Sequence, residues 1–173
     1  MSDSQAFCPP AYLTATHELA LFQSGEDALD NWLQDRALDN MKTGATRTYV
    51  ISTSGSSKVI GYYAICMGHI LNHQVVGSMR RNMPQLIPAV ILGRLAIDKK
   101  WQGKGLGKAL LNDAVQRTLR ASREVSARLL IVHSISSEAE DFYLHHGFIR
   151  LPVETPTFAI DLIKFAGLTE LTG

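Results

Sequence analysis

A glycine-rich turn between an apolar segment and a helical pattern is the clearest candidate for a binding site in this chain. Glycine stands at every second position from Gly103 to Gly107, and Lys104 and Lys108 belong to the same run. Glycines let a backbone approach an anion closely, and the first N–H groups of a helix have no partner within the helix. The turn is therefore predicted to bind phosphate, with the two lysines adding positive charge.

The spacing of the turn excludes two common nucleotide-binding motifs. A P-loop requires Ser or Thr directly after its Gly-Lys pair, whereas Gly105 and Ala109 stand at those positions here. A dinucleotide fingerprint fails as well, because its last glycine would fall on Lys108 or Leu110. A tight structural connection is the alternative to a binding site, but three alternating glycines favour a different type of phosphate site.

Two segments together resemble the signatures of one enzyme family. Gln102-x-x-Gly105-x-Gly107 follows an apolar strand, and residues 142–148 read Phe-Tyr-Leu-His-His-Gly-Phe. The first is similar to the pyrophosphate-binding signature of the GNAT N-acetyltransferase superfamily, and the second resembles the aromatic segment near its fourth core helix. The resemblance implies the GNAT acyl-CoA N-acyltransferase fold: an α+β fold with a mixed central sheet flanked by helices, formed by residues 1–173 as a single domain.

The resemblance also implies which residues hold acetyl-CoA, the acetyl donor of the family. The backbone of Leu95, Ala96 and Ile97 would pair with the pantetheine arm and supply N–H donors for the oxyanion of acetyl transfer. The other cofactor-binding candidates are the turn and one aromatic residue: Gln102, Gly103, Lys104, Gly105, Leu106, Gly107, Lys108 and Phe142.

Acetyl transfer from a thioester further requires an acid that protonates the departing thiolate. Tyr143 is the predicted catalytic residue, because GNAT enzymes often use a tyrosine at this motif position. A phenol with a pKa of about 10 keeps its proton at neutral pH. The neighbouring Phe142 and Phe148 have the pattern of core aromatics.

No general base is evident near the predicted thioester site. The strand from Arg94 to Ile97 carries no carboxylate where many GNAT enzymes place a glutamate. A lysine amine with a pKa of about 10.4 needs help to lose its proton, whereas an α-amine with a pKa of about 8 is partly neutral at pH 7. The site therefore suits an α-amine. His133, His145 and His146 are candidates for a base or a water relay, although each is more typical of a structural histidine.

Additional segments narrow the resemblance to the GNAT toxins of type II toxin–antitoxin modules in bacteria. These segments are Phe22–Gly25, Leu29–Leu33, Arg47–Val50, Gly61–Tyr63 and Leu92–Ile97. Toxins of this group acetylate the amino acid on a charged tRNA, block translation and are neutralised by a ribbon-helix-helix antitoxin. The resemblance thus implies aminoacyl-tRNA as substrate, an antitoxin partner, contact with operator DNA only through that antitoxin, and a homodimer.

The distribution of charge supports an RNA substrate. The net charge is only +1, yet residues 80–128 hold eleven of the seventeen Lys and Arg residues against three acids. Because tRNA phosphates need cationic partners, the predicted tRNA-binding residues are Arg80, Arg81, Arg94, Lys99 and Lys100. The other arginines of this region, Arg117, Arg120, Arg123 and Arg128, are interpreted as the solvated face and exit of a helix.

Two alternatives to the toxin interpretation stay open. An ordinary GNAT enzyme that acetylates protein N-termini or small amines would present an acidic acceptor cleft, whereas the segments expected around the cleft are basic. A regulatory protein that acts mainly as co-repressor within an antitoxin–DNA complex would not need Tyr143.

The apolar periodicity predicts the elements that position these residues. A helix over 26–43 begins at a capping box of Ser24 and Asp27, ends at Gly44 and exposes Asp30, Asp35 and Asp39. The other predicted elements are a hairpin of 46–52 and 58–70, a long loop over 71–88, a strand over 90–97, a helix over 104–122, a strand over 129–132, a helix over 137–145 and a strand over 157–163.

Length and composition are those of one globular domain, with 173 residues, 46% hydrophobic and 19% charged. No apolar run approaches the about 18 residues of a membrane span, and the first residues lack a secretory pattern, so a cytoplasmic protein without membrane contact is expected. Cys8 and Cys66 are expected to be reduced thiols. His69 and His73 lie on a strand that leads into a loop, so no metal site is predicted.

Overall fold

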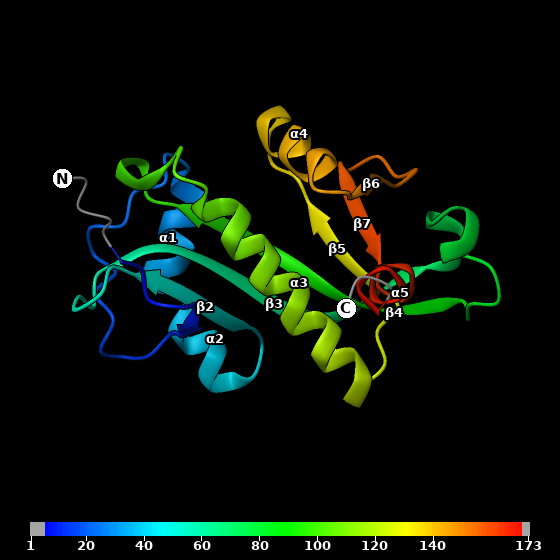
Figure 1. Ribbon diagram of the computed structural model, residues 1–173, viewed down its shortest axis with the longest axis horizontal. Coiled ribbons are helices and arrows are strands. Elements are labelled where there is room, and N and C mark those ends of the chain that lie inside the picture. The colour runs from blue at the N-terminus through cyan, green and yellow to red at the C-terminus, as the bar shows by residue number, and fades with distance from the viewer. Residues whose placement is uncertain (1–5, 171–173) are drawn as a thin grey trace. The chain divides into compact units, whose positions relative to one another are not determined.

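The computed structural model describes residues 6–170, and the chain forms two compact units (Figure 1). One unit comprises Met1–Cys66 and Arg94–Ala114, and the other comprises Met67–Gly93 and Val115–Gly173. The seven strands follow the order β1-β2-β3-β4-β5-β7-β6, with a parallel β4–β5 pair and antiparallel pairs toward both ends. The predicted α+β class with a mixed sheet is therefore confirmed.

The first unit contains the N-terminal helices, a hairpin and the glycine turn. Its elements are β1 (Ala11–Tyr12), α1 (Asp27–Asp35), α2 (Ala37–Thr43), β2 (Arg47–Ser52), the start of β3 (Val59–Leu71), the end of β4 (Leu86–Ile97), the 3-10 helix η3 (Lys99–Trp101) and the start of α3 (Leu106–Glu124). The predicted hairpin is confirmed, because β2 and β3 pair antiparallel from Arg47↔Ile65 to Ile51↔Gly61.

The predicted helix over 26–43 is two helices, because the backbone leaves helical geometry at Arg36. The Arg36 N–H still donates to the Trp32 carbonyl at 2.9 Å, so the apolar spacing continues across the break. Leu33 and Ala37, one on each side, are both fully buried in the core of this unit. The predicted end is confirmed, since Gly44 adopts the left-handed conformation with φ 79°.

The predicted capping box and part of the solvated acidic face are wrong. Glu26 is the N-cap residue of α1 and makes no side-chain cap bond, so Ser24 and Asp27 do not form the expected pair. Instead, the Ser24 hydroxyl and N–H donate to the Asp30 carboxylate at 2.6 and 3.0 Å. Asp30 is therefore a buried acceptor that fixes the chain before α1, while the other two acids of the predicted face are exposed.

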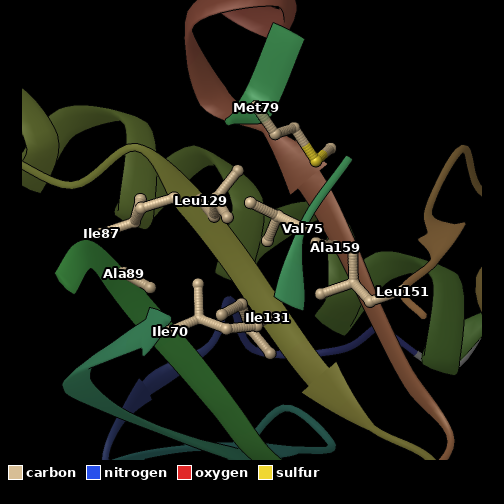
Figure 2. Close-up of a cluster of buried hydrophobic side chains, with 9 residues drawn as sticks. All are labelled: Ile70, Val75, Met79, Ile87, Ala89, Leu129, Ile131, Leu151 and Ala159. Carbon is tan, nitrogen blue, oxygen red and sulfur yellow. The ribbon is translucent and has the colours of Figure 1, made fainter. Parts of the chain in front are cut away.

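The second unit is built around a parallel strand pair. Its remaining elements are the 3-10 helices η1 (Asn72–Gln74) and η2 (Gly77–Met79), β5 (Leu129–His133), α4 (Ser137–His145), β6 (Ile149–Arg150), β7 (Thr157–Asp161) and α5 (Leu162–Glu170). Ala89–Leu92 of β4 pair with Leu129–Val132 of β5, and β5 pairs antiparallel with β7. Figure 2 shows their apolar side chains gathered with Val75 and Met79 of the β3–β4 connection.

Two boundaries of this unit differ from the prediction. The loop expected over 71–88 is shorter, because β4 begins at Leu86 and includes Pro88. The strand expected over 157–163 ends at Asp161, where α5 begins.

Arg128 is not the solvated cation that was predicted. Its Nε and Nη2 donate to the two Asp161 carboxylate oxygens at 2.9 Å each, and Nη2 also donates to the Ser78 carbonyl at 3.0 Å. Burial raises the pKa of the Asp161 carboxyl, but the hydrogen bonds and charge of Arg128 outweigh it and hold that pKa below its usual value. Arg120 and Arg123 are exposed, as predicted.

Candidate active site

The glycine turn of the first unit presents a row of unpaired backbone donors. Gly103 and Gly105 have φ values of 76° and 80°, which side chains rarely adopt. Within residues 6–170, the N–H groups of positions 103–108 have no hydrogen-bond partner, and the Ala109 N–H is the next to donate, to the Gly105 carbonyl at 3.1 Å. Such a row of N–H groups at the start of an α-helix suits a phosphate or diphosphate.

The side chains around the turn divide into exposed and buried ones. Lys104 and Lys108 are exposed, and the Lys104 ammonium lies 5.9 Å from the centre of the Trp101 ring. Leu106 is buried, so among the predicted cofactor-binding residues it can offer only its backbone N–H. The lysines are thus the side chains of the turn that can meet an anion in solvent.

The Gln102 side chain is occupied within the protein. Its Nε2 donates to the Ser24 carbonyl at 2.8 Å and to the Ile97 carbonyl at 2.9 Å. The neighbouring Asp98 carboxylate accepts from the N–H groups of Gln23 and Lys100, both at 3.0 Å. Gln102 and Asp98 therefore fix the turn to the end of β4 and to the segment before α1.

The sequence analysis missed the roles of Asp98 and Ser24. Asp98 is preceded by a buried strand and followed by two lysines, and its buried carboxylate caps η3. An acid placed directly before a short helix is a local capping signal that could have identified it. No local signal could have paired Ser24 with Gln102.

The end of β4 continues past its pairing with β5. The β4–β5 ladder covers Ala89–Leu92, whereas the strand extends to Ile97. Ala96 and Ile97 are buried and Leu95 is half-buried. The segment that is predicted to bind the thioester arm is thus part of a regular strand, so its backbone is extended.

Arg94 precedes this segment and lies on an aromatic ring. Its guanidinium carbon is 4.2 Å from the centre of the Trp32 ring, and Arg94 is half-buried. The Trp32 ring is nearly parallel to that of Tyr62, at 6.0 Å and 13°. Across the described residues, Arg94 has no hydrogen bond and no ion pair.

Tyr143 lies on α4, in the second unit. The Ser136 hydroxyl accepts from the Ala139 N–H at 3.2 Å and caps this helix. Tyr143 is only 6% exposed and packs edge-on against Phe142 and Phe148. Burial raises the pKa of the Tyr143 hydroxyl to about 12.

The Tyr143 hydroxyl has no hydrogen-bond partner in the part of the chain that the structure describes. With a raised pKa it carries its proton at neutral pH and can donate it to a ligand. Phe148 is buried as predicted, whereas Phe142 is half-buried.

The candidate histidines have structural partners. His146 Nδ1 lies 2.7 Å from the Phe142 carbonyl, and His133 Nδ1 lies 3.0 Å from the Thr157 hydroxyl. His145 is exposed at the end of α4. These contacts favour structural roles for His146 and His133.

The predicted tRNA-binding cations lie in both units. Lys99 and Lys100 are exposed on η3 of the first unit, which also holds Arg94. In the second unit, Arg80 and Arg81 are exposed in the β3–β4 connection. Arg80 Nε donates to Asn72 Oδ1 at 2.9 Å, so the direction of this side chain is fixed.

Asn72 organises the whole β3–β4 connection. Its Nδ2 donates to the carbonyls of Arg80, Met83 and Pro84 at 3.2, 3.0 and 3.3 Å. The sequence analysis did not single out this residue, although Asn at the end of a strand is a common turn signal.

Three other expectations concern a metal site, the two thiols and a membrane span. Within 6–170, no three His, Cys, Asp or Glu residues gather in a group that could hold a metal ion. His69 lies on β3 as predicted, whereas His73 lies in the 3-10 helix η1 and not in a loop. Cys8 and Cys66 are free. None of the described helices is long and apolar enough to cross a membrane.

Comparison with known families decides the class of this site. Residues 45–150 match the family model described as an acetyltransferase (GNAT) domain. The chain belongs to the GNAT acetyltransferase family. The matched region includes the glycine turn and the Tyr143 segment, so both candidate segments lie within the GNAT domain. The predicted fold and enzyme class, an acetyl-CoA-dependent N-acetyltransferase, are confirmed.

The relatives of this GNAT chain include toxins. It is 37% identical over 160 residues to a tRNA-acetylating toxin from Mycobacterium tuberculosis (strain ATCC 25618 / H37Rv), covering 92% of this chain and 95% of the relative. A solved structure of AtaT complexed with acetyl-methionyl-tRNAfMet is 28% identical with a TM-score of 0.88, covering 94% of this chain and 99% of AtaT. A Tyr-to-Phe mutant of KacT is 25% identical with a TM-score of 0.88, covering 95% and 99% of the two chains.

Other AtaT structures contain further molecules. One holds a Tyr-to-Phe mutant of AtaT bound to the C-terminus of the antitoxin AtaR and to acetyl-CoA, at 28% identity and a TM-score of 0.81, covering 94% of this chain and 98% of AtaT. Another is the AtaT–AtaR complex bound to DNA, at 29% identity and a TM-score of 0.75, covering 92% and 98%.

Proposed function

We propose that this chain is the toxin of a toxin–antitoxin pair and transfers an acetyl group from acetyl-CoA to the α-amino group of the amino acid on a charged tRNA. The observation that carries the proposal is the 37% identity to a tRNA-acetylating toxin, which extends over 92% of the chain. An N-acetylated aminoacyl-tRNA has no free amine for peptide-bond formation, so translation would stop.

The glycine turn fits the diphosphate of acetyl-CoA. The unpaired N–H groups of positions 103–108 offer donors to phosphate oxygens, and Lys104 and Lys108 neutralise their charge. Gln102 contributes by holding the turn in place through Ser24 and Ile97. When bound, acetyl-CoA supplies an activated thioester carbonyl.

The end of β4 and Tyr143 are assigned to the chemistry. The backbone of Leu95, Ala96 and Ile97 pairs with the pantetheine arm and donates N–H groups to the negative charge that develops on the carbonyl oxygen. The Tyr143 hydroxyl donates its proton to the sulfur as the carbon–sulfur bond breaks, and the phenolate regains a proton from the acylated nitrogen. Because burial raises the pKa of Tyr143 to about 12, the phenolate takes up that proton readily.

The acceptor is an α-amine because this chain supplies no carboxylate base along Arg94–Ile97. An α-amino group with a pKa of about 8 is already partly neutral at pH 7 and needs only orientation. The exposed cations Arg80, Arg81, Lys99 and Lys100, together with Arg94, are assigned to the phosphates of the tRNA.

The proposed function includes protein and DNA partners. We assign to this chain a cognate antitoxin of the ribbon-helix-helix type, a homodimeric state, and contact with operator DNA only through the antitoxin, which would make the pair a co-repressor of its own operon. AtaT complexes with the antitoxin AtaR and with DNA support the antitoxin partner and the contact with DNA. Charged tRNA places the activity in the cytoplasm.

The test is acetylation of bulk charged tRNA by the purified chain with labelled acetyl-CoA, followed by nuclease digestion and mass analysis of the aminoacyl-adenosine. We expect acetylated aminoacyl-adenosine from the wild type. In Tyr143→Phe the rate should fall by about a hundredfold or more, since general acid catalysis contributes that much. Tyr12→Phe is the matched control, because Tyr12 is exposed on β1 and its phenol lies outside the assigned residues.

Two outcomes would contradict the proposal. Label on added peptides or polyamines but not on RNA would return the chain to the ordinary GNAT enzymes. Full activity in Tyr143→Phe would remove Tyr143 from the mechanism.

A further inference from the structure

Arg94 is a half-buried cation without an anion. Among the residues the structure describes, it has neither a hydrogen bond nor an ion pair, and its contact is the face of Trp32 at 4.2 Å. A charge that is partly removed from water is costly unless an opposite charge or hydrogen-bond acceptors compensate for it. The free N–H groups of Arg94 therefore point to an anionic ligand.

The Trp32 ring supports the Arg94 guanidinium, whose central carbon lies 4.2 Å from the ring centre. The Trp32 ring is itself held in place by the parallel ring of Tyr62, 6.0 Å away. Tyr62 is fully buried, and its hydroxyl donates to the Leu29 carbonyl at 2.7 Å, which ties the ring to α1. A guanidinium over an indole face gives up no N–H group to a protein acceptor, so its N–H groups stay available for an anion.

The position of Arg94 along β4 relates this anion site to the acetyl-transfer strand. Side chains two apart on a strand share one face, so Arg94 lies on the same face as Ala96. Ala96 belongs to the buried cluster with Tyr62 and Leu33, which places this face against the α1 side. An anion held by Arg94 would thus lie beside the residues assigned to the thioester.

On the basis of the proposed function, we infer that Arg94 binds the phosphate nearest the aminoacylated end of the tRNA and that Trp32 is the positioning residue that orients it. A charged tRNA carries its last phosphodiester one nucleoside away from the amino acid, so a cation beside the thioester strand meets that group. The planar guanidinium suits the paired oxygens of a phosphodiester.

Steady-state kinetics with charged tRNA at several salt concentrations tests the inference. Arg94→Met should raise KM for charged tRNA about tenfold, as loss of a charged hydrogen bond does, and leave kcat within about twofold. Log affinity falls with log salt, and one fewer neutralised phosphate should make this slope less negative by about 0.7. Arg123→Met, which removes an exposed arginine of α3, is the matched control and should change neither KM nor the slope.

Variants of Trp32 distinguish a role in orienting Arg94 from a role in folding alone. Trp32→Ala should raise KM several-fold with the salt slope unchanged, because Arg94 keeps its charge but loses its orientation. Trp32→Phe keeps an aromatic face and should restore most of the affinity. Arg94→Lys should keep the slope and raise KM, since an ammonium lacks the planar fork.

Some results would overturn the inference and leave the proposed function standing. These are an unchanged salt slope in Arg94→Met, or a fall in kcat without a change in KM. A shift in the pH dependence of kcat/KM in Arg94→Met would assign Arg94 to the ionisation of the amine instead. Absence of RNA acetylation by the wild type is a different result, because it rejects the proposed function itself.

Discussion

Two half-buried arginines of this molecule have opposite surroundings. Arg128, in the second unit, donates to both oxygens of Asp161 and to the Ser78 carbonyl. Arg94, in the first unit, contacts the Trp32 ring and, over the described positions, no acceptor. A cation that donates to a carboxylate and a carbonyl of the protein holds structure, whereas one that rests on a ring keeps its donors free. The partners of an arginine therefore say more about its role than its position in the sequence does.

The largest change in stability is expected when the ion pair of Arg128 and Asp161 is broken. Asp161→Asn leaves the Arg128 charge partly buried without its carboxylate and should lower the free energy of unfolding by about 3 kcal/mol. Urea denaturation of the purified chain measures this loss. Asp35→Asn, at an exposed acid of α1, is the control and should change stability by less than about 0.5 kcal/mol. Equal stability of the two variants would show that the Arg128–Asp161 pair adds nothing.

The same pair should make the protein sensitive to acid. Because the pKa of Asp161 is lower in the folded chain, the unfolded chain binds a proton first as the pH falls. The stabilisation is complete above the ordinary carboxyl pKa of about 4 and is lost as the pH falls through the lower, folded value. Urea midpoints measured from pH 6 to pH 3 should fall less steeply in Asp161→Asn than in the wild type. Parallel curves would contradict this account.

A smaller loss of stability is expected when Asn72, which binds the loop that carries Arg80, is replaced. Asn72→Ala removes three bonds to carbonyls and one from Arg80, and should cost about 1 to 2 kcal/mol of stability. Hydrogen exchange of the amides between 77 and 85 should become faster. His73→Ala, at the exposed neighbour in η1, serves as the control. Unchanged exchange in Asn72→Ala would mean that the loop holds its shape without it.

The smallest effect on stability is expected at the unpaired arginine. Arg94→Met should change the free energy of unfolding by less than about 0.5 kcal/mol, because loss of the ring contact is offset by removal of an uncompensated charge. The same urea experiment measures it. A loss comparable to that of Asp161→Asn would remove the contrast between the two arginines.

Local signals in the sequence predicted much of the fold and of the site. The glycine turn and the Gly44 end of α2 each depend on a few adjacent residues, and both lie where they were expected. The β2–β3 hairpin was predictable for the same reason, since its turn residues and the β-branched and aromatic residues that flank them are adjacent in the sequence. Patterns of this kind specify backbone geometry directly.

Contacts between distant residues were not predictable from one sequence. Arg94 and Trp32, or Arg128 and Asp161, meet only because strands and helices pack, and nothing near either residue specifies its partner. The start of β4 was missed because Pro88 is atypical within a strand. The break at Arg36 was missed because the apolar spacing continues through it.

The polar contacts that hold the β3–β4 connection are made chiefly to its backbone. Asn72 and Arg128 bind carbonyl oxygens of positions 78, 80, 83 and 84, and every amino acid possesses a carbonyl. Exposed residues of this segment, such as Arg81, can therefore be replaced over evolutionary time without remodelling the loop. Single substitutions here could change the charge of this surface, while the contacts of Asn72, Arg128 and Asp161 stay the same.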